Sequence, residues 1–259
     1  MPRYKITLAY HGREYFGFQV QPQKKTIQGA LEDTFFKILG ETLRVTPSGR
    51  TDTGVHAKKQ TCHLDILSQK AIQRADAADM VYKLNAVLPN DCRVISFKKT
   101  KDTFHAQRQC RQKKYTYNIL VSRFKNPFLN DFVWCLHTPL DQQAMKKAAV
   151  ALTGTHDFSA FCASDSAAKN KTRKILKITF SNRKPSAFLA IKGETYISIT
   201  FTGTGFLKQM VRNMVGTLVA VGQHKIKPLD IKKILHSKDR KKAFATAPAK
   251  GLFLTEVNY

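Results

Sequence analysis

The stretch SGRTDTGVHA, residues 48–57, sets one carboxylate, Asp52, two residues after Arg50 and two residues before a glycine. Apolar residues alternate with polar ones over 43–47 and again over 62–66, which predicts a strand on each side of this stretch. Asp52 is therefore expected on a loop between two strands, where functional groups concentrate. Arg50 can pair with this carboxylate and keep it ionised near neutral pH. A tight turn carrying a surface ion pair is the alternative interpretation.

The composition is that of a folded and strongly basic protein. The 259 residues include 44 Lys and Arg against 18 Asp and Glu, a formal net charge of +26, and 42% of the residues are hydrophobic. Basic blocks such as 169–174 (KNKTRK) and 238–242 (KDRKK) would singly be solvated faces, but an excess spread over the whole chain predicts a polyanionic partner. Nucleic acid fits better than a membrane, because no stretch approaches the roughly 20 apolar residues of a membrane span. Without a signal-peptide core at its start, the protein is expected in the cytoplasm.

Metal and cofactor sites are not indicated. The cysteines contain no Cys-x-x-Cys pair and the histidines show no ligand spacing, so we expect reduced thiols and no metal. Gly203 and Gly205 lack the third glycine of a dinucleotide fingerprint. The five cysteines are Cys62, Cys92, Cys110, Cys135 and Cys162.

Mixed helix and strand patterns predict an α+β protein of two halves, 1–103 and 104–259. Thr26 and Asp141 are expected to cap helices, and Pro228 is expected in the first turn of another. The predicted strands cover 4–10, 93–97, 115–121, 174–180, 188–191 and 196–201, and the predicted helices cover 27–38, 80–87, 142–152, 207–221 and 228–236.

Two further candidates come from the second half. The stretch 206–222 (FLKQMVRNMVGTLVAVG) is apolar nearly all round, which predicts a buried helix with Arg212 in its middle. A guanidinium in such surroundings needs an anion, in a structural or a functional pair. Tyr115 and Tyr117 share one face of a predicted strand, where core packing is the default role.

The stretch 48–57 closely resembles the catalytic loop of the TruA family of tRNA pseudouridine synthases, with Thr53 where most members have alanine. Six collinear blocks extend the resemblance over nearly the whole chain. They are 4–20 (YKITLAYHGREYFGFQV), 84–89 (LNAVLP), 104–106 (FHA), 113–117 (KKYTY), 206–222 and 246–254 (TAPAKGLFL).

The resemblance implies two ferredoxin-like halves with joined antiparallel sheets and a basic active-site cleft between them. It assigns catalysis to Asp52 and substrate binding to Tyr115, Arg50 and Arg212, with Arg212 beside the aspartate. The implied reaction isomerises uridine to pseudouridine in the anticodon stem-loop of tRNA, by a homodimer without a cofactor. Asp52 would attack carbon 1′, add to the base or take the 2′ proton, and the sequence does not choose among these routes.

Two rival functions fit the sequence less well. An aspartic protease would use the Asp-Thr-Gly at Asp52, but such enzymes need two carboxylates that share a proton, and no second Asp-Thr-Gly is present. Arg50 and Arg212 would also lower the pKa of this carboxylate. A non-catalytic RNA-binding protein would satisfy the charge but leaves the Asp52 loop unexplained.

Overall fold

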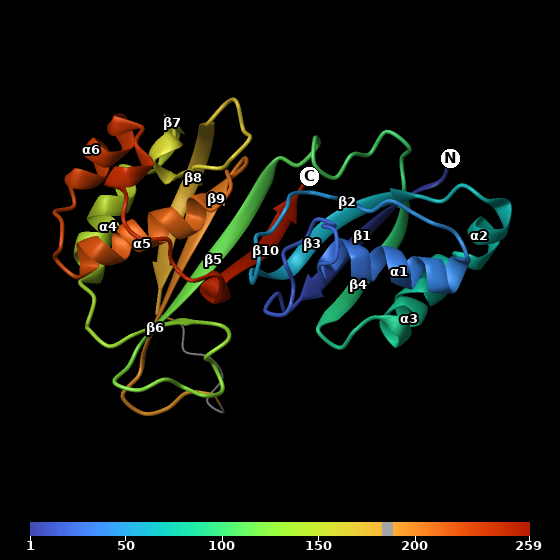
Figure 1. The fold of residues 1–259 in the computed structure, drawn as a ribbon, viewed down its shortest axis with the longest axis horizontal. Coiled ribbons are helices and arrows are strands. Elements are labelled where there is room, and N and C mark those ends of the chain that lie inside the picture. The colour runs from blue at the N-terminus through green and yellow to red at the C-terminus, as the bar shows by residue number, and fades with distance from the viewer. Residues whose placement is uncertain (183–188) are drawn as a thin grey trace. The chain divides into compact units, whose positions relative to one another are not determined.

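The structure is a computed structural model that describes residues 1–182 and 189–259 (Figure 1). The chain forms two compact units, Met1–Arg111 with Phe253–Tyr259, and Gln112–Leu252. Each unit combines helices with a mainly antiparallel sheet, which confirms the predicted α+β class. No helix in the described part of the chain is long and apolar enough to cross a membrane.

The first unit contains a sheet in the order β4-β1-β3-β10, with the short β2 paired to β3. Alternate residues of β1 are buried, and from that face Tyr4 stacks on Phe97 of β4 with ring centroids 4.7 Å apart. Phe35 of α1 lies 6.1 Å from the same Phe97 ring, so α1 covers this face of the sheet (Figure 1). The elements are β1 Arg3–Tyr10, α1 Ile27–Leu39, β2 Thr46–Pro47, β3 His56–Asp65, α2 Gln69–Arg74, α3 Ala77–Val87, β4 Cys92–Thr100 and β10 Leu252–Asn258.

Helix α1 is capped at both ends. The Thr26 hydroxyl accepts a hydrogen bond from the Gly29 backbone N–H at 3.3 Å, as predicted for its start. Gly40 ends the helix in the left-handed region, with φ 70°.

The second unit contains a sheet in the order β5-β9-β8-β7, with β6 parallel to β5. Helices α4 and α5 lie beside each other over this sheet (Figure 1). Asp141 caps α4 as predicted, because its carboxylate accepts from the Ala144 N–H at 2.9 Å. The elements are β5 Gln112–Val121, β6 Trp134–Leu136, α4 Gln142–Val150, β7 Gly154–Asp157, η1 Ser159–Phe161, β8 Thr172–Ser181, β9 Thr195–Gly203, α5 Met210–Gly222, α6 Asp230–Ser237, η2 Arg240–Lys242 and η3 Ala249–Gly251.

Several elements differ in their bounds from the sequence predictions. Helix α5 begins at Met210 because Gln209 has φ 57°, so Arg212 lies in the first turn and not in the middle. Pro228 precedes α6, which begins at Asp230. The strand predicted over 188–191 is wrong for 189–191, which lead into a turn closed by Glu194 N–H and the Ile191 carbonyl at 3.3 Å, and Phe188 lies outside the described residues.

Candidate active site

Asp52 lies on the loop between β2 and β3, as predicted, and its side chain is half-buried. The last residue of β1 and the segment that follows it hold this loop by three hydrogen bonds. Phe18 N–H donates to the Thr51 carbonyl at 3.1 Å, and Gly54 N–H donates to the Tyr15 carbonyl at 3.2 Å. The buried hydroxyls of Tyr10 and Thr51 share a third bond of 2.8 Å. Both neighbours of the Asp52–Thr53 dipeptide are therefore fixed.

Two glycines of the same segment approach the loop more closely than any other residue could. A Cβ on Gly12 would lie 2.0 Å from the Val55 carbonyl oxygen. A Cβ on Gly17 would lie 2.7 Å from the Thr51 carbonyl oxygen, and Gly17 has φ +86°. The role of these two glycines could not be predicted from the sequence, because each contact joins backbones from distant parts of the chain.

The buried side chain of Tyr15 anchors the segment that follows β1. It is 1% exposed, and its hydroxyl donates a hydrogen bond to the carboxylate of Asp91. The Lys25 ammonium lies 3.3 Å from that carboxylate and 4.4 Å from the Tyr15 ring centroid. Burial, followed by the bond to Asp91, raises the pKa of Tyr15 far above its ordinary value. The phenol therefore stays a neutral donor at every physiological pH.

The other side of the Asp52 loop is tied to β3. Ser48 N–H donates to the Thr61 carbonyl at 2.7 Å, and the Gln60 amide donates to the Gly49 carbonyl at 2.8 Å. Arg50 is exposed and lines a small hollow together with Arg44. A hollow with two arginines at its wall suits an anionic group such as a phosphate.

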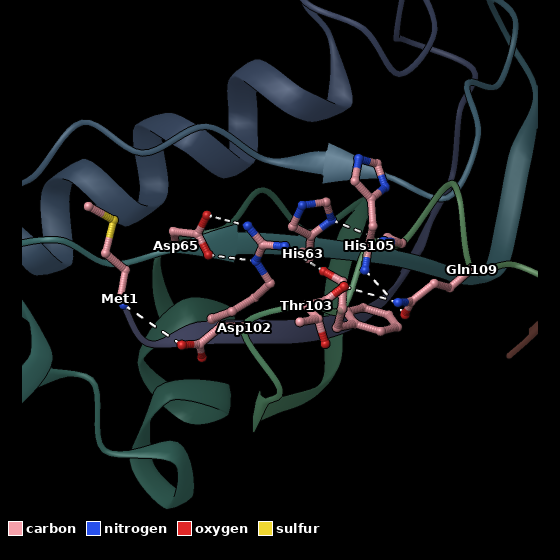
Figure 2. Close-up of polar contacts among 10 residues, drawn as sticks. Met1, His63, Asp65, Asp102, Thr103, His105 and Gln109 are labelled. Atoms are coloured by element: carbon pink, nitrogen blue, oxygen red, sulfur yellow. Dashed lines mark hydrogen bonds and ion pairs between the residues drawn. The ribbon is translucent and has the colours of Figure 1, made fainter.

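The Phe104–Ala106 block has a structural role within this unit (Figure 2). Arg3 holds the Asp65 carboxylate with two bonds of 2.7 and 2.8 Å and donates to the Phe104 carbonyl at 2.7 Å. The Nδ1 atom of His63 accepts from Ala106 N–H at 3.2 Å. Burial, with the nearby cation of Arg3, lowers the pKa of His63 to about 4. His63 is therefore a neutral acceptor that fixes the block to β3.

In the second unit, Tyr115 and Tyr117 lie on the buried face of β5, as the alternation predicted. Tyr115 is 7% exposed and packs edge-on against Phe206, with ring centroids 5.1 Å apart. Tyr117 is fully buried, and its hydroxyl donates to the Pro248 carbonyl at 2.7 Å. Tyr117 is thus a packing residue that ties β5 to the segment before β10.

Arg212 differs from every other residue of α5. All other residues of the helix are buried, whereas Arg212 is half-buried. Its Nε–H donates to the Ala247 carbonyl at 2.7 Å, and Ala247 N–H donates back to the Arg212 carbonyl at 3.2 Å. The sequence could not predict this anchor, which lies 35 residues further along the chain. The expected pairing of Arg212 and of Arg50 with Asp52 stays a prediction.

Metal chemistry has no candidate site among the described residues, where no group of three or more His, Cys, Asp or Glu could hold an ion. The five cysteines are free thiols, and Cys62, Cys92 and Cys162 are buried.

Comparison with known proteins identifies the family. A family model described as tRNA pseudouridine synthase matches residues 6–108 and 148–259. The chain is 42% identical to tRNA pseudouridine synthase A of Lawsonia intracellularis, with all of both chains covered. It is 39% identical to the enzyme of that name from Thermoanaerobacter sp. (98% of each chain) and 39% to that from Myxococcus xanthus (100% of this chain, 92% of the relative). The chain therefore belongs to the tRNA pseudouridine synthase family and is an isomerase that acts on tRNA.

Proposed function

We propose that this enzyme isomerises uridines of the tRNA anticodon stem-loop and that Asp52 is its catalytic nucleophile. The observation that carries the proposal is that close backbone contacts and hydrogen bonds fix the Asp52 loop in place. Gly12 and Gly17 bring backbone against the loop, and the buried Tyr10–Thr51 bond fixes the residue directly before the carboxylate. A reacting group held this way keeps its geometry when substrate arrives, which is what positioning in catalysis requires.

The proposed reaction requires an ionised carboxylate and no redox cofactor. Pseudouridine formation breaks the N-glycosidic bond, turns the uracil and rejoins it through carbon 5. Carbon 5 loses a proton and nitrogen 1 gains one, so atoms and electrons balance without a redox cofactor. Attack at carbon 1′, addition to the base and removal of the 2′ proton all begin with an ionised carboxylate. Arg50, two residues from Asp52 and exposed, supports that charge state by its own positive charge.

Substrate binding is assigned to Tyr115, Arg50 and Arg212. A uridine in a stem must leave the base stack to be reached, and the enzyme must then hold the extruded nucleotide. The Tyr115 ring would stack on the target base, and a guanidinium such as that of Arg212 would bind its phosphate or its carbonyl oxygens. The anchors at Phe206 and Ala247 support these roles because they restrict both side chains before substrate binds.

The basic surface supports tRNA as the partner. Exposed cations that bind the tRNA backbone would include Lys169, Lys174, Lys241 and Lys242. We propose a homodimer that works in the cytoplasm, with one tRNA contacting both subunits, as the family resemblance implies. Sedimentation with and without tRNA would show a monomer if the dimer is wrong.

The proposal is tested by mapping pseudouridine in tRNA transcripts incubated with purified wild type, Asp52→Asn and Asp33→Asn. Asp33 is an exposed carboxylate on α1 and serves as the matched control. Wild type and Asp33→Asn should modify anticodon stem-loop uridines, and Asp52→Asn should modify none. Modification confined to another arm of the tRNA would overturn the assigned target, and full modification by Asp52→Asn would overturn the nucleophile.

A further inference from the structure

The basic block 238–242 contains residues with different surroundings. Lys241 and Lys242 are exposed, and the Lys238 ammonium lies 3.4 Å from the carboxylate of Asp157. Arg240 instead points inward, and its guanidinium is half-buried. Arg240 therefore has different surroundings from the other basic residues of the block 238–242.

Three neutral oxygens accept hydrogen bonds from Arg240. One terminal nitrogen donates to the Asn213 side-chain oxygen and to the Thr246 hydroxyl, both at 3.0 Å, and the other donates to the Ala243 carbonyl at 3.1 Å. Burial lowers the pKa of Arg240 from its usual value, although the group stays charged. The cost of removing a partly buried cation from water offsets part of what its hydrogen bonds contribute. The three fixed acceptors also impose a geometry on the groups around Arg240.

The acceptors belong to one buried network. Asn213 is fully buried on α5, where its amide donates to the Phe161 carbonyl at 2.8 Å and its oxygen accepts from the Thr246 hydroxyl at 2.7 Å. Arg240 thus joins α5 to the segment Ala243–Ala247, which we call the strap.

The strap fits closely along α5. Phe244 N–H donates to the Thr217 hydroxyl at 3.2 Å. A Cβ on Gly216 would lie 1.9 Å from the Ala245 carbonyl oxygen, so the two backbones are in direct contact. At its end, directly after Thr246, Ala247 exchanges two hydrogen bonds with Arg212.

We propose that Arg240 is a positioning residue for Arg212. Arg240 and Asn213 hold Thr246, and the next residue presents the carbonyl that binds Nε of Arg212. Because a guanidinium is planar, an acceptor fixed on Nε also sets the plane of the two terminal nitrogens. Arg240 would then act on the rate of isomerisation, whereas its exposed neighbours act on affinity. The proposal rests on the substrate-binding role proposed for Arg212.

The test compares Arg240→Met with Lys241→Met and with Lys232→Met, an exposed lysine of α6 outside the block. Single-turnover rate at saturating tRNA and dissociation constant are measured for each. Arg240→Met should lower the rate about tenfold or more, as for a reacting group displaced by a fraction of an ångström. Its affinity should change no more than that of Lys241→Met. Lys232→Met should match wild type in rate, and Arg240→Lys, which keeps one donor group, should recover part of the loss.

Coupling to Arg212 separates positioning from a general effect on the fold. In an Arg212→Met background, Arg240→Met should lower the rate no further, because two residues that act through one group are not additive. Thr246→Val removes the central hydroxyl at nearly constant shape and serves if Arg240→Met does not fold. A wild-type rate with weakened binding for Arg240→Met, or equal losses in both backgrounds, would overturn the inference. A wild-type rate for Arg212→Met alone would instead refute the proposed role of Arg212.

Discussion

Replacing Gly17 with alanine should slow isomerisation while tRNA binding persists. Gly17 lies between two fixed elements, since its carbonyl accepts from Ile27 N–H at the start of α1 at 3.2 Å and its Cα faces the Thr51 carbonyl. The new Cβ would lie 2.7 Å from that oxygen, whereas ordinary contact begins near 3.4 Å. The loop before Asp52 must therefore withdraw by about 0.7 Å, since α1 blocks movement the other way.

The size of the effect follows from this displacement. A misplacement of about 1 Å can lower a rate about 100-fold, so we expect a loss of roughly 10- to 100-fold in single-turnover rate. An L-residue at positive φ costs roughly 1–2 kcal/mol, and forcing a methyl group into packed surroundings costs about 1–3 kcal/mol more. The free energy of unfolding should thus fall by roughly 2–5 kcal/mol.

Gly193→Ala is the matched control. Gly193 has φ +88°, and a Cβ there would meet no atom within 4 Å in the described part of the structure. It should lose only the conformational part, about 1–2 kcal/mol, and keep its rate. Urea unfolding and single-turnover assays with excess enzyme measure both quantities. A folded Gly17→Ala enzyme with the wild-type rate would refute the view that this contact positions Asp52.

Two further predictions concern pH and salt. In the folded protein the pKa of His63 is lowered to about 4 from an ordinary 6.5. The unfolded chain therefore takes up this proton first as pH falls. The free energy of unfolding should decrease by up to about 3 kcal/mol between about pH 6.5 and pH 4. His63→Gln, which keeps an acceptor for Ala106, should flatten that dependence in urea unfolding at a pH series, and an unchanged slope would contradict the assignment. If about five tRNA phosphates are contacted, a fourfold rise in salt should weaken binding roughly 100- to 500-fold. Charge reversal at Lys241 and Lys242 should reduce this slope, and a slope near zero in wild type would show that recognition does not depend on the basic surface.

Local signals in the sequence predicted the elements whose ends are set by local chemistry. The start of helix α1 was predicted from Thr26, whose hydroxyl caps the helix within its first turn. The start of α5 was misplaced because the left-handed conformation of Gln209 has no sequence signature in a glutamine.

The candidate site was predicted as single residues, without what holds them. The position of the Asp52 loop depends on backbone contacts with Gly12 and Gly17, which lie more than 30 residues away in the chain. Local sequence patterns do not predict such long-range contacts. The role of Arg240 could not be predicted for the same reason. A run of charges in the sequence does not reveal which of them turns inward to bind Asn213.

Asp52 is expected to carry the chemistry, while the basic surface carries the affinity for tRNA. This division of roles is tested most directly by measuring single-turnover rate and tRNA dissociation constant in parallel for wild type and Asp52→Ala. One carboxylate among many phosphate contacts should matter little to binding. We predict no detectable pseudouridine with Asp52→Ala and a dissociation constant within a few-fold of wild type. Appreciable turnover by the purified variant would contradict the assignment of Asp52 as the nucleophile.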